Sequence, residues 1–181
     1  MRTRSVLRTA ATAALGLSLL VGTGAAASPA SASSGAVRVL KYNSSQAGEF
    51  RSVIAQAVQI WNSSVTNVQI VAGSPADITF YVDNGWPRAM PTSLGRGRIW
   101  MGRQATGQGH NALRIGTHEI GHILGMPDRR TGLCSQLMSG SSAGTSCTNP
   151  NPNAAEIAEV NRYFAGQVAP SIEYNKEYVN R

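Results

Sequence analysis

Residues 117–128 read T-H-E-I-G-H-I-L-G-M-P-D, and their types and spacing suit a catalytic metal site. Residues four apart on an α-helix share a face, so His118 and His122 can both direct their imidazoles at one metal ion. Glu119 lies one position further round the helix and can reach a water molecule beside that ion. Such a group can hydrolyse a peptide bond, with the metal polarising the carbonyl and the glutamate acting as general base.

Asp128 can supply the third protein ligand. A catalytic zinc ion usually takes three protein ligands and leaves its fourth position to water. Gly125 can adopt the left-handed conformation that ends a helix, and Pro127 stiffens the chain that follows. The chain can therefore turn after the helix and return a carboxylate to the metal. We predict one Zn²⁺ ion bound by His118, His122 and Asp128.

A structural or decayed metal site is the alternative interpretation of this motif, because a helix with two histidines can be merely structural. Met138 follows in L-M-S-G, where a methionine turn would pass below the metal. A single methionine in a compact fold is more often core filler. The remaining histidine, His110, lies outside the metal spacing, and we interpret it as a loop or helix-cap residue.

The first 32 residues have the composition of a secretory signal peptide. Three arginines within the first eight residues precede an apolar run at 10–21, and small residues end in Ala30-Ser31-Ala32. The apolar run is shorter than the roughly 20 residues that a membrane-spanning helix needs. We therefore expect cleavage near Ala32, secretion of the protein, and no membrane association afterwards.

The rest of the chain has the length of one domain. We assign 33–166 to a catalytic domain and 167–181 to a polar C-terminal tail. Without the N-terminal arginines the net charge falls from +7 to about +4, which points to no particular partner. The arginines between 88 and 103 lie in glycine-rich sequence without interleaved aromatic residues, so nucleic-acid binding is not expected. We expect a monomer that acts on proteins or peptides.

The two cysteines, Cys134 and Cys147, are predicted to form a disulfide bond. Both lie in a Gly/Ser/Asn-rich stretch of a chain that is expected to be exported, and oxidising compartments favour disulfides. Zinc–thiolate sites usually contain closely spaced cysteine pairs, which this sequence lacks.

Hydrophobic periodicity predicts strands and helices that could position the motif. Residues 84–98 show no periodicity and are interpreted as a loop. The run 99–101 is expected to be an edge strand to which an extended substrate could add. The expected strands are 37–42, 68–71, 78–82 and 99–101, and the expected helices are 46–61, 111–124 and 154–165.

The motif H-E-I-G-H-I-L-G-M-P-D, followed by C-S-Q-L-M-S-G and C-T-N-P-N-P-N, resembles the snapalysins, small neutral zinc endopeptidases secreted by actinomycetes. It looks like a metzincin whose third histidine is replaced by aspartate. The similarity includes A-V-R-V and Q-I-W-N-S-S-V-T-N-V-Q, so it spans roughly 36–164 and leaves out the tail. The resemblance implies an α+β fold with a mixed sheet, a backing helix, an active-site helix, and a small C-terminal part with a Met-turn and a last helix.

The resemblance also implies roles for individual residues. His118, His122 and Asp128 match the metal ligands, Glu119 matches the general base, and Met138 matches the Met-turn that supports the metal site. Members of the family are expected to prefer an aromatic residue on the amino-group side of the cut. A non-catalytic secreted binding module with a structural zinc is the alternative function, and it would show no hydrolysis that a chelator can abolish.

Two positions depart from the family pattern. Arg130 stands where the snapalysins carry a tyrosine that can donate to the developing oxyanion. Arg130 is therefore a candidate for this donor or for a residue that supports the metal ligands, and a solvent-facing charge is the alternative. Asn111 stands where the family's calcium site has an aspartate. Calcium favours charged oxygen ligands, so we do not predict Ca²⁺.

Overall fold

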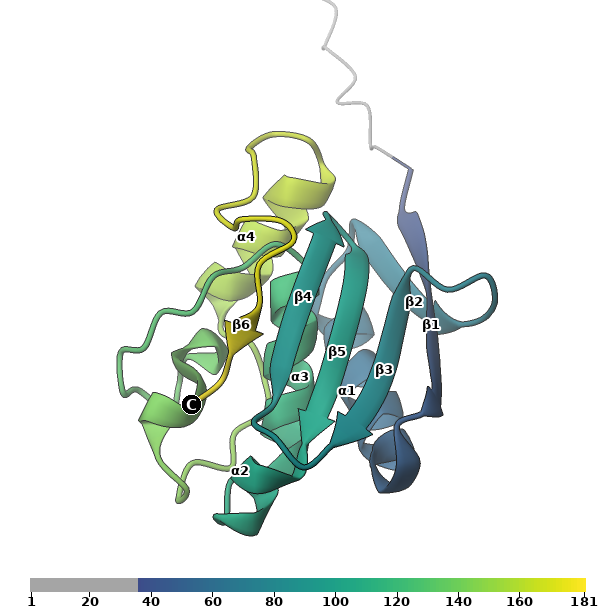
Figure 1. Cartoon of the computed structure of the whole chain (residues 1–181). Helices are drawn as coiled ribbons and strands as arrows, with labels where there is room; N and C mark the ends of the chain where they lie inside the picture. The colour runs from purple at the N-terminus through teal and green to yellow at the C-terminus, as the bar shows by residue number, and fades with distance from the viewer. Residues whose placement is uncertain (1–35) are drawn as a thin grey trace, which may run out of the picture. The chain divides into compact units, whose positions relative to one another are not determined.

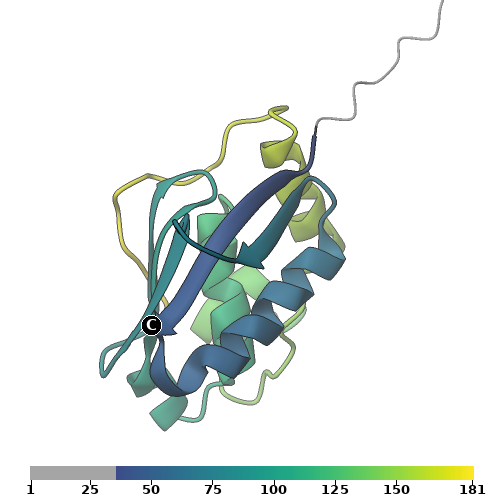
Figure 2. The same cartoon turned by 90° about the vertical axis from the view of Figure 1, so that its right-hand side faces the viewer.

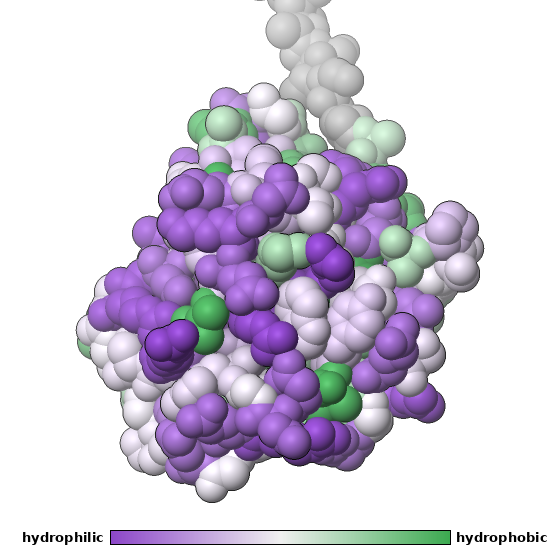
Figure 3. Space-filling model, viewed as in Figure 1, coloured by the Kyte–Doolittle hydropathy of each residue, from purple (hydrophilic) through white to green (hydrophobic). Residues whose placement is uncertain are grey.

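The structure is a computed structural model that describes residues 36–181. The signal peptide predicted at 1–32 lies outside the described residues. In the described part, a six-stranded sheet carries two helices, α1 and α3, against one face, while the other face is open (Figures 1 and 2). The open face is mainly hydrophilic, as expected for a surface in contact with water (Figure 3). Within 36–181, no helix combines the length and apolar character needed to cross a membrane.

The sheet is mixed, which confirms the predicted α+β class. Its strand order is β2-β1-β3-β5-β4-β6. The strands β2, β1, β3 and β5 run parallel to one another, whereas β4 is antiparallel to both β5 and β6. The strands are β1 (Arg38–Gln46), β2 (Val68–Ala72), β3 (Ile78–Asp83), β4 (Arg88–Ser93), β5 (Arg96–Gly102) and β6 (Tyr178–Val179).

Two long helices cover the inner face of the sheet. Trp61 of α1 is fully buried, and its indole N–H donates to the backbone oxygen of Thr117 in α3 at 2.9 Å. This bond ties the backing helix to the residue that precedes the first motif histidine. The helices are η1 (Gly48–Phe50), α1 (Arg51–Ser64), α2 (Arg103–Gly107), α3 (Ala112–Ile123), η2 (Leu137–Ala143) and α4 (Ala154–Phe164).

The prediction of a loop at 84–98 is wrong, because the structure forms β4 there and joins it to β5 by a tight turn. Leu94 and Gly95 make the turn between the paired residues Ser93 and Arg96, and Gly95 has a φ of 79°, which favours glycine. The inward residues of β4 include Ala89 and Pro91. Neither residue is typical of a strand, so the alternation of buried and exposed positions in β4 cannot be recognised from hydrophobicity in the sequence. The short helix α2 was also not predicted.

The first strand and helix have different boundaries from those expected. The strand continues past its expected end at residue 42 as far as Gln46, with an irregular register between Asn43 and Gln46. The α-helix begins at Arg51, five residues later than expected, after the single 3-10 turn η1.

The expectation that 99–101 forms an edge strand is also wrong. β5 lies between β3 and β4, so both of its sides are paired. β4 is the strand near the motif that has an outer side, and β6 from the C-terminal tail pairs with it there (Figure 1). The tail thus ends in a strand of the sheet.

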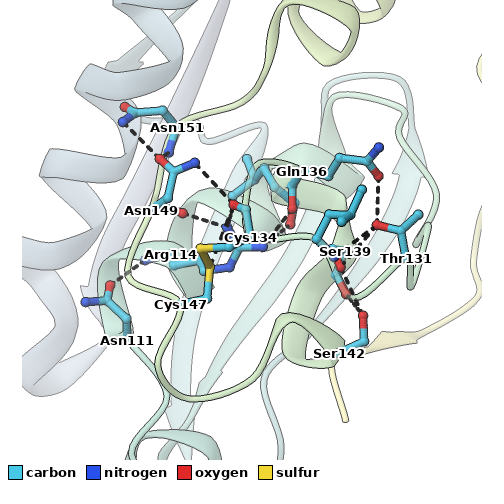
Figure 4. The surroundings of a disulfide bond; sticks show 12 residues. Asn111, Arg114, Thr131, Cys134, Gln136, Ser139, Ser142, Cys147, Asn149 and Asn151 are labelled. Atoms are coloured by element: carbon cyan, nitrogen blue, oxygen red, sulfur yellow. Dashed lines mark hydrogen bonds between the residues drawn. A yellow bond between two sulfur atoms is a disulfide. The ribbon is translucent and has the colours of Figure 1, made fainter.

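The segment after α3 is held by a buried arginine and by the predicted disulfide, which is present. Cys134 and Cys147 are bonded, with 5.4 Å between their Cα atoms. Arg114 of α3 is only 5% exposed, and its guanidinium donates to the backbone oxygens of Asn149 at 2.6 Å and Gln136 at 2.7 Å (Figure 4). The cysteine loop is therefore attached directly to the helix that carries the motif.

We expect the double substitution Cys134→Ser, Cys147→Ser to lower the free energy of unfolding by about 3 kcal/mol, because the bond closes a short loop in the unfolded chain. Urea denaturation of both proteins at neutral pH measures the difference. A loss well below about 1 kcal/mol would mean that the Arg114 hydrogen bonds hold the loop without the covalent link.

Candidate metal centre

Helix α3 presents the motif as predicted. Asn111 is its N-cap, and the Asn111 side-chain oxygen accepts from the backbone N–H of Arg114 at 2.9 Å. The helix ends at Ile123, and Gly125 has a φ of 101°, the left-handed conformation predicted for it. The chain turns at this glycine and passes back along the helix towards Asp128.

The structure brings the three predicted ligands together. The Nε2 atoms of His118 and His122 are 3.1 Å apart, and Oδ1 of Asp128 lies 3.2 Å and 3.7 Å from them respectively. Ligands that each lie about 2 Å from one ion at tetrahedral angles are roughly 3.3 Å from one another. The spacing of these three atoms therefore fits a single metal ion.

Backbone carbonyls orient both histidines. The Nδ1 atom of His118 lies 3.0 Å from the oxygen of Leu137, and Nδ1 of His122 lies 2.8 Å from the oxygen of Met126. A carbonyl oxygen only accepts, so each contact requires a proton on Nδ1. Each Nε2 then keeps a free lone pair directed at the shared position, as a metal ligand requires.

Arg130 lies beside Asp128. Its Nη2 donates to Oδ2 of Asp128 at 3.0 Å, which leaves Oδ1 facing the histidines. Nη2 also donates to the backbone oxygen of Val179 at 2.7 Å, and Nη1 donates to the backbone oxygen of Arg181. The guanidinium thus contacts the carboxylate of a predicted ligand and the backbone oxygens of two tail residues, and it is not a free solvent-facing charge.

Glu119 is fully buried next to the three ligands. Among the described residues, neither of its carboxylate oxygens has a complete hydrogen bond. Burial raises the pKa of this carboxyl well above its usual value, and the negative charge of Asp128 raises it further. The Asn180 amide is close enough to lower the pKa without completing a hydrogen bond, and Arg130 opposes the rise as well. A buried acid without a partner is suited to exchanging a proton with a bound molecule.

The charges of the ligands are also perturbed. Burial lowers the pKa of His122 to about 3, assisted by the nearby His118, so the ring is neutral at physiological pH. Burial alone would raise the pKa of Asp128, but the adjacent side chains, His118 foremost, lower it to about 2. Among the described residues, Oδ1 of Asp128 has no hydrogen-bond partner although it is buried. Two neutral imidazoles and one unpartnered carboxylate oxygen form a donor set that zinc accepts.

The turn below the site is fixed by a buried glutamate that the sequence analysis missed. Glu156 of α4 is 2% exposed, and its carboxylate accepts from the backbone N–H groups of Leu137, Met138 and Asn153 at 3.1, 2.8 and 2.7 Å. Asn153 and Glu156 form a capping box, whose N-x-x-E spacing was the signal that could have found it.

Met138 is fully buried under the active-site helix. Gly121 lies between the two motif histidines in the sequence. A Cβ atom built on it would lie 2.6 Å from the Met138 sulfur, so the absence of a side chain at this position makes room for the methionine. This position agrees with the Met-turn that the resemblance implies.

Residues of the tail also reach the site, and no pattern in the sequence indicated this. The ring of Tyr178 stacks on the ring of His122, with 4.8 Å between centroids and 27° between planes. Asn180 is 3% exposed, and its side-chain oxygen accepts from the backbone N–H of Ser141 at 2.7 Å. His110 lies in the loop before α3, as expected, but it lines a small cavity together with His118 and Asn180.

Comparison with known proteins gives the family. Residues 36–167 match the model of the Streptomyces extracellular neutral proteinase (M7) family. The extracellular small neutral protease of Streptomyces caespitosus is 47% identical over 126 residues, which cover 68% of this chain and 95% of that protein. The protein of the same name from Streptomyces coelicolor is 44% identical over 149 residues, which cover 80% of this chain and 68% of that protein.

One solved structure is a weaker match. High choriolytic enzyme 1, a hatching enzyme zinc-protease from the medaka fish Oryzias latipes, has a TM-score of 0.48 and 14% identity, with 71% of this chain and 90% of that chain covered. This likeness is too low to support an assignment. The sequence matches confirm the resemblance to the snapalysins. The chain belongs to the Streptomyces extracellular neutral proteinase (M7) family and is a metalloendopeptidase.

Proposed function

We propose that this protein is a secreted zinc endopeptidase that hydrolyses peptide bonds in proteins. In this proposal His118, His122 and Asp128 hold one Zn²⁺ ion, and Glu119 is the general base. The observation that carries the proposal is the convergence of three ligand atoms, all within 4.8 Å of one another, beside a fully buried glutamate without a hydrogen-bond partner. Secretion is supported by the names of the relatives, which are called extracellular.

The residues divide the chemistry between them. When bound, Zn²⁺ supplies Lewis acidity, which lowers the pKa of a water molecule and polarises the scissile carbonyl. The Glu119 carboxylate takes the proton from that water and later gives it to the leaving amine. The raised pKa of Glu119 suits a group that must hold a proton between two steps.

Arg130 is the candidate donor to the carbonyl oxygen of the substrate. Its guanidinium already donates to the peptide carbonyl of Val179, so it can bind a backbone oxygen close to the proposed metal ligand Asp128. A fixed positive charge stabilises an oxyanion that develops within its reach. This is the role that the resemblance gives to the tyrosine that Arg130 replaces.

The preference for an aromatic residue on the amino-group side of the cut is part of the proposal and rests on the family. Mapping the cleavage sites on a denatured protein tests it. Calcium is not proposed, because the oxygen of Asn111 is already occupied as the helix cap.

Glu119→Gln tests the base directly. The amide keeps the shape of the side chain but cannot accept the proton, so we expect kcat/KM on a casein-type substrate to fall by roughly 10² to 10⁴-fold. Zinc content, measured by mass spectrometry of the metal, is expected to stay at one ion per chain. Equal cleavage by both proteins would exclude Glu119 as the base, and hydrolysis that survives a zinc chelator would exclude the metal.

Asp128→Ala tests the third ligand. Loss of a residue that only supports a ligand costs about 10 to 100-fold in metal affinity, so loss of the ligand itself is expected to cost roughly 100-fold or more. Competition with a fluorescent chelator measures the affinity. The matched control is Asp77→Ala, which removes a carboxylate paired with Arg96 instead. Unchanged affinity in the Asp128 variant would place the third ligand elsewhere.

The buried acid also has a pH signature in the metal-free protein. Unfolded Glu119 loses its proton near pH 4.5, whereas the folded protein keeps it to higher pH, so folding stability falls as the pH rises above 4.5 through the folded pKa. Glu119→Gln removes this loss. We therefore expect the variant to be more stable than the parent at pH 7, with the difference shrinking towards pH 4.5. Urea denaturation in chelator at several pH values measures the gap, and a gap independent of pH contradicts the assignment.

A further inference from the structure

The C-terminal tail occupies the sheet edge that runs past the metal centre. Tyr178 and Val179 pair antiparallel with Ala89 and Arg88 of β4. The pairing continues at both ends, because Asn180 donates from its backbone N–H to the oxygen of Pro87 at 3.0 Å and Asn175 donates to that of Pro91 at 2.7 Å. Figure 1 shows this yellow segment lying beside β4, between the sheet and the C-terminal part of the fold.

We propose that residues 175–181 are a built-in peptide ligand of the active site, which occupies the place of an extended substrate and must leave before a substrate binds. The proposal rests on the proposed peptidase function. An extended substrate can add to an exposed strand edge through main-chain hydrogen bonds. β4 has one such edge, and the tail uses its backbone groups.

Contacts of the tail with the metal centre support this role. The Tyr178 ring covers one face of the His122 ring, and Asn180 is buried against Ser141 and close to Glu119. With the tail in place, the side chains of His118, Glu119 and His122 are all fully buried. A peptidase needs open space at this position for both water and the scissile carbonyl. The arrangement with the tail docked is therefore closed to a substrate.

The donor set that holds the tail is one that a substrate backbone could use. Arg130 donates to the carbonyls of Val179 and Arg181, and the hydroxyl of Ser141 also donates to Arg181. These bonds involve main-chain oxygens, so they do not depend on the side chains of the bound segment. The main-chain part of this docking is therefore of a kind that an extended peptide could also make.

The tail is also placed to be displaced. Its strand β6 has only two residues, and the family match ends at residue 167, before the tail begins to pair. Residues 166–177 are mostly exposed, whereas Tyr178, Val179 and Asn180 are partly or fully buried. The buried contacts of the tail are therefore concentrated at the active site. A substrate peptide that binds there would compete with these contacts directly.

The test compares two tyrosines of the tail in the full chain. Tyr178→Ala removes the ring stacked on His122, and Tyr174→Ala removes a ring that is 39% exposed and does not contact the metal residues. A docked tail lowers the fraction of enzyme that can bind substrate, so it raises the apparent KM and leaves kcat unchanged. We expect Tyr178→Ala to lower KM roughly two- to tenfold with kcat unchanged, and Tyr174→Ala to change neither.

A second measurement does not depend on activity. Hydrogen exchange of the amides of Asn180 and Ser141, which the docked tail protects, is expected to be faster in Tyr178→Ala and unchanged in Tyr174→Ala. A synthetic peptide of residues 170–181 is expected to bind Tyr178→Ala and to inhibit it competitively. The same peptide with alanine at 178 is expected to bind more weakly. Mass spectrometry checks that the peptide stays intact.

The outcomes separate this proposal from the peptidase proposal. Faster exchange in Tyr178→Ala with unchanged KM overturns the inhibitory role of the tail, and a fall in kcat shows that the tail is a structural wall of the active site instead. If the synthetic peptide of residues 170–181 does not bind Tyr178→Ala, that result alone overturns the proposal that the tail docks at the active site. If no variant hydrolyses any substrate while exchange and peptide binding behave as expected, the peptidase function fails and the docking stands.

Discussion

The structure depends on keeping the three side chains of the proposed metal centre together in a largely buried place. Removing imidazole and carboxylate groups from water is costly unless each polar atom has a partner. The partners of the two histidines are the backbone oxygens of Leu137 and Met126, both of which come after the helix in the sequence. The site is therefore only as rigid as the irregular chain that follows α3.

Two buried charged residues give that irregular chain its rigidity. Arg114 donates to carbonyls of the cysteine loop, and Glu156 accepts from the N–H groups of the turn at Leu137 and Met138. Backbone groups that are buried outside helices and strands need such partners. The active-site helix, the disulfide loop and α4 are thus linked through hydrogen bonds to one short turn.

The other side of the site is formed by a sheet edge. The outer side of β4 brings a row of backbone groups close to the proposed metal ligands, and such an edge can bind an extended chain. The C-terminal tail pairs with this edge and places Tyr178 on His122. Arg130 contacts both Asp128 and the backbone of Val179, so it links the segment that follows α3 to the tail.

The sequence by itself determined the parts that depend on local spacing. The helix with two histidines four apart, its start near Asn111 and its end at Gly125 were all predicted, because helical periodicity and terminal conformations are set within a few residues. The capping role of Asn111 came from the structure. Only the tertiary structure decided which strand forms the edge and where the tail lies. β4 is paired through backbone groups that carry no side-chain signature, and Tyr178 meets His122 across a separation in sequence that no local pattern records.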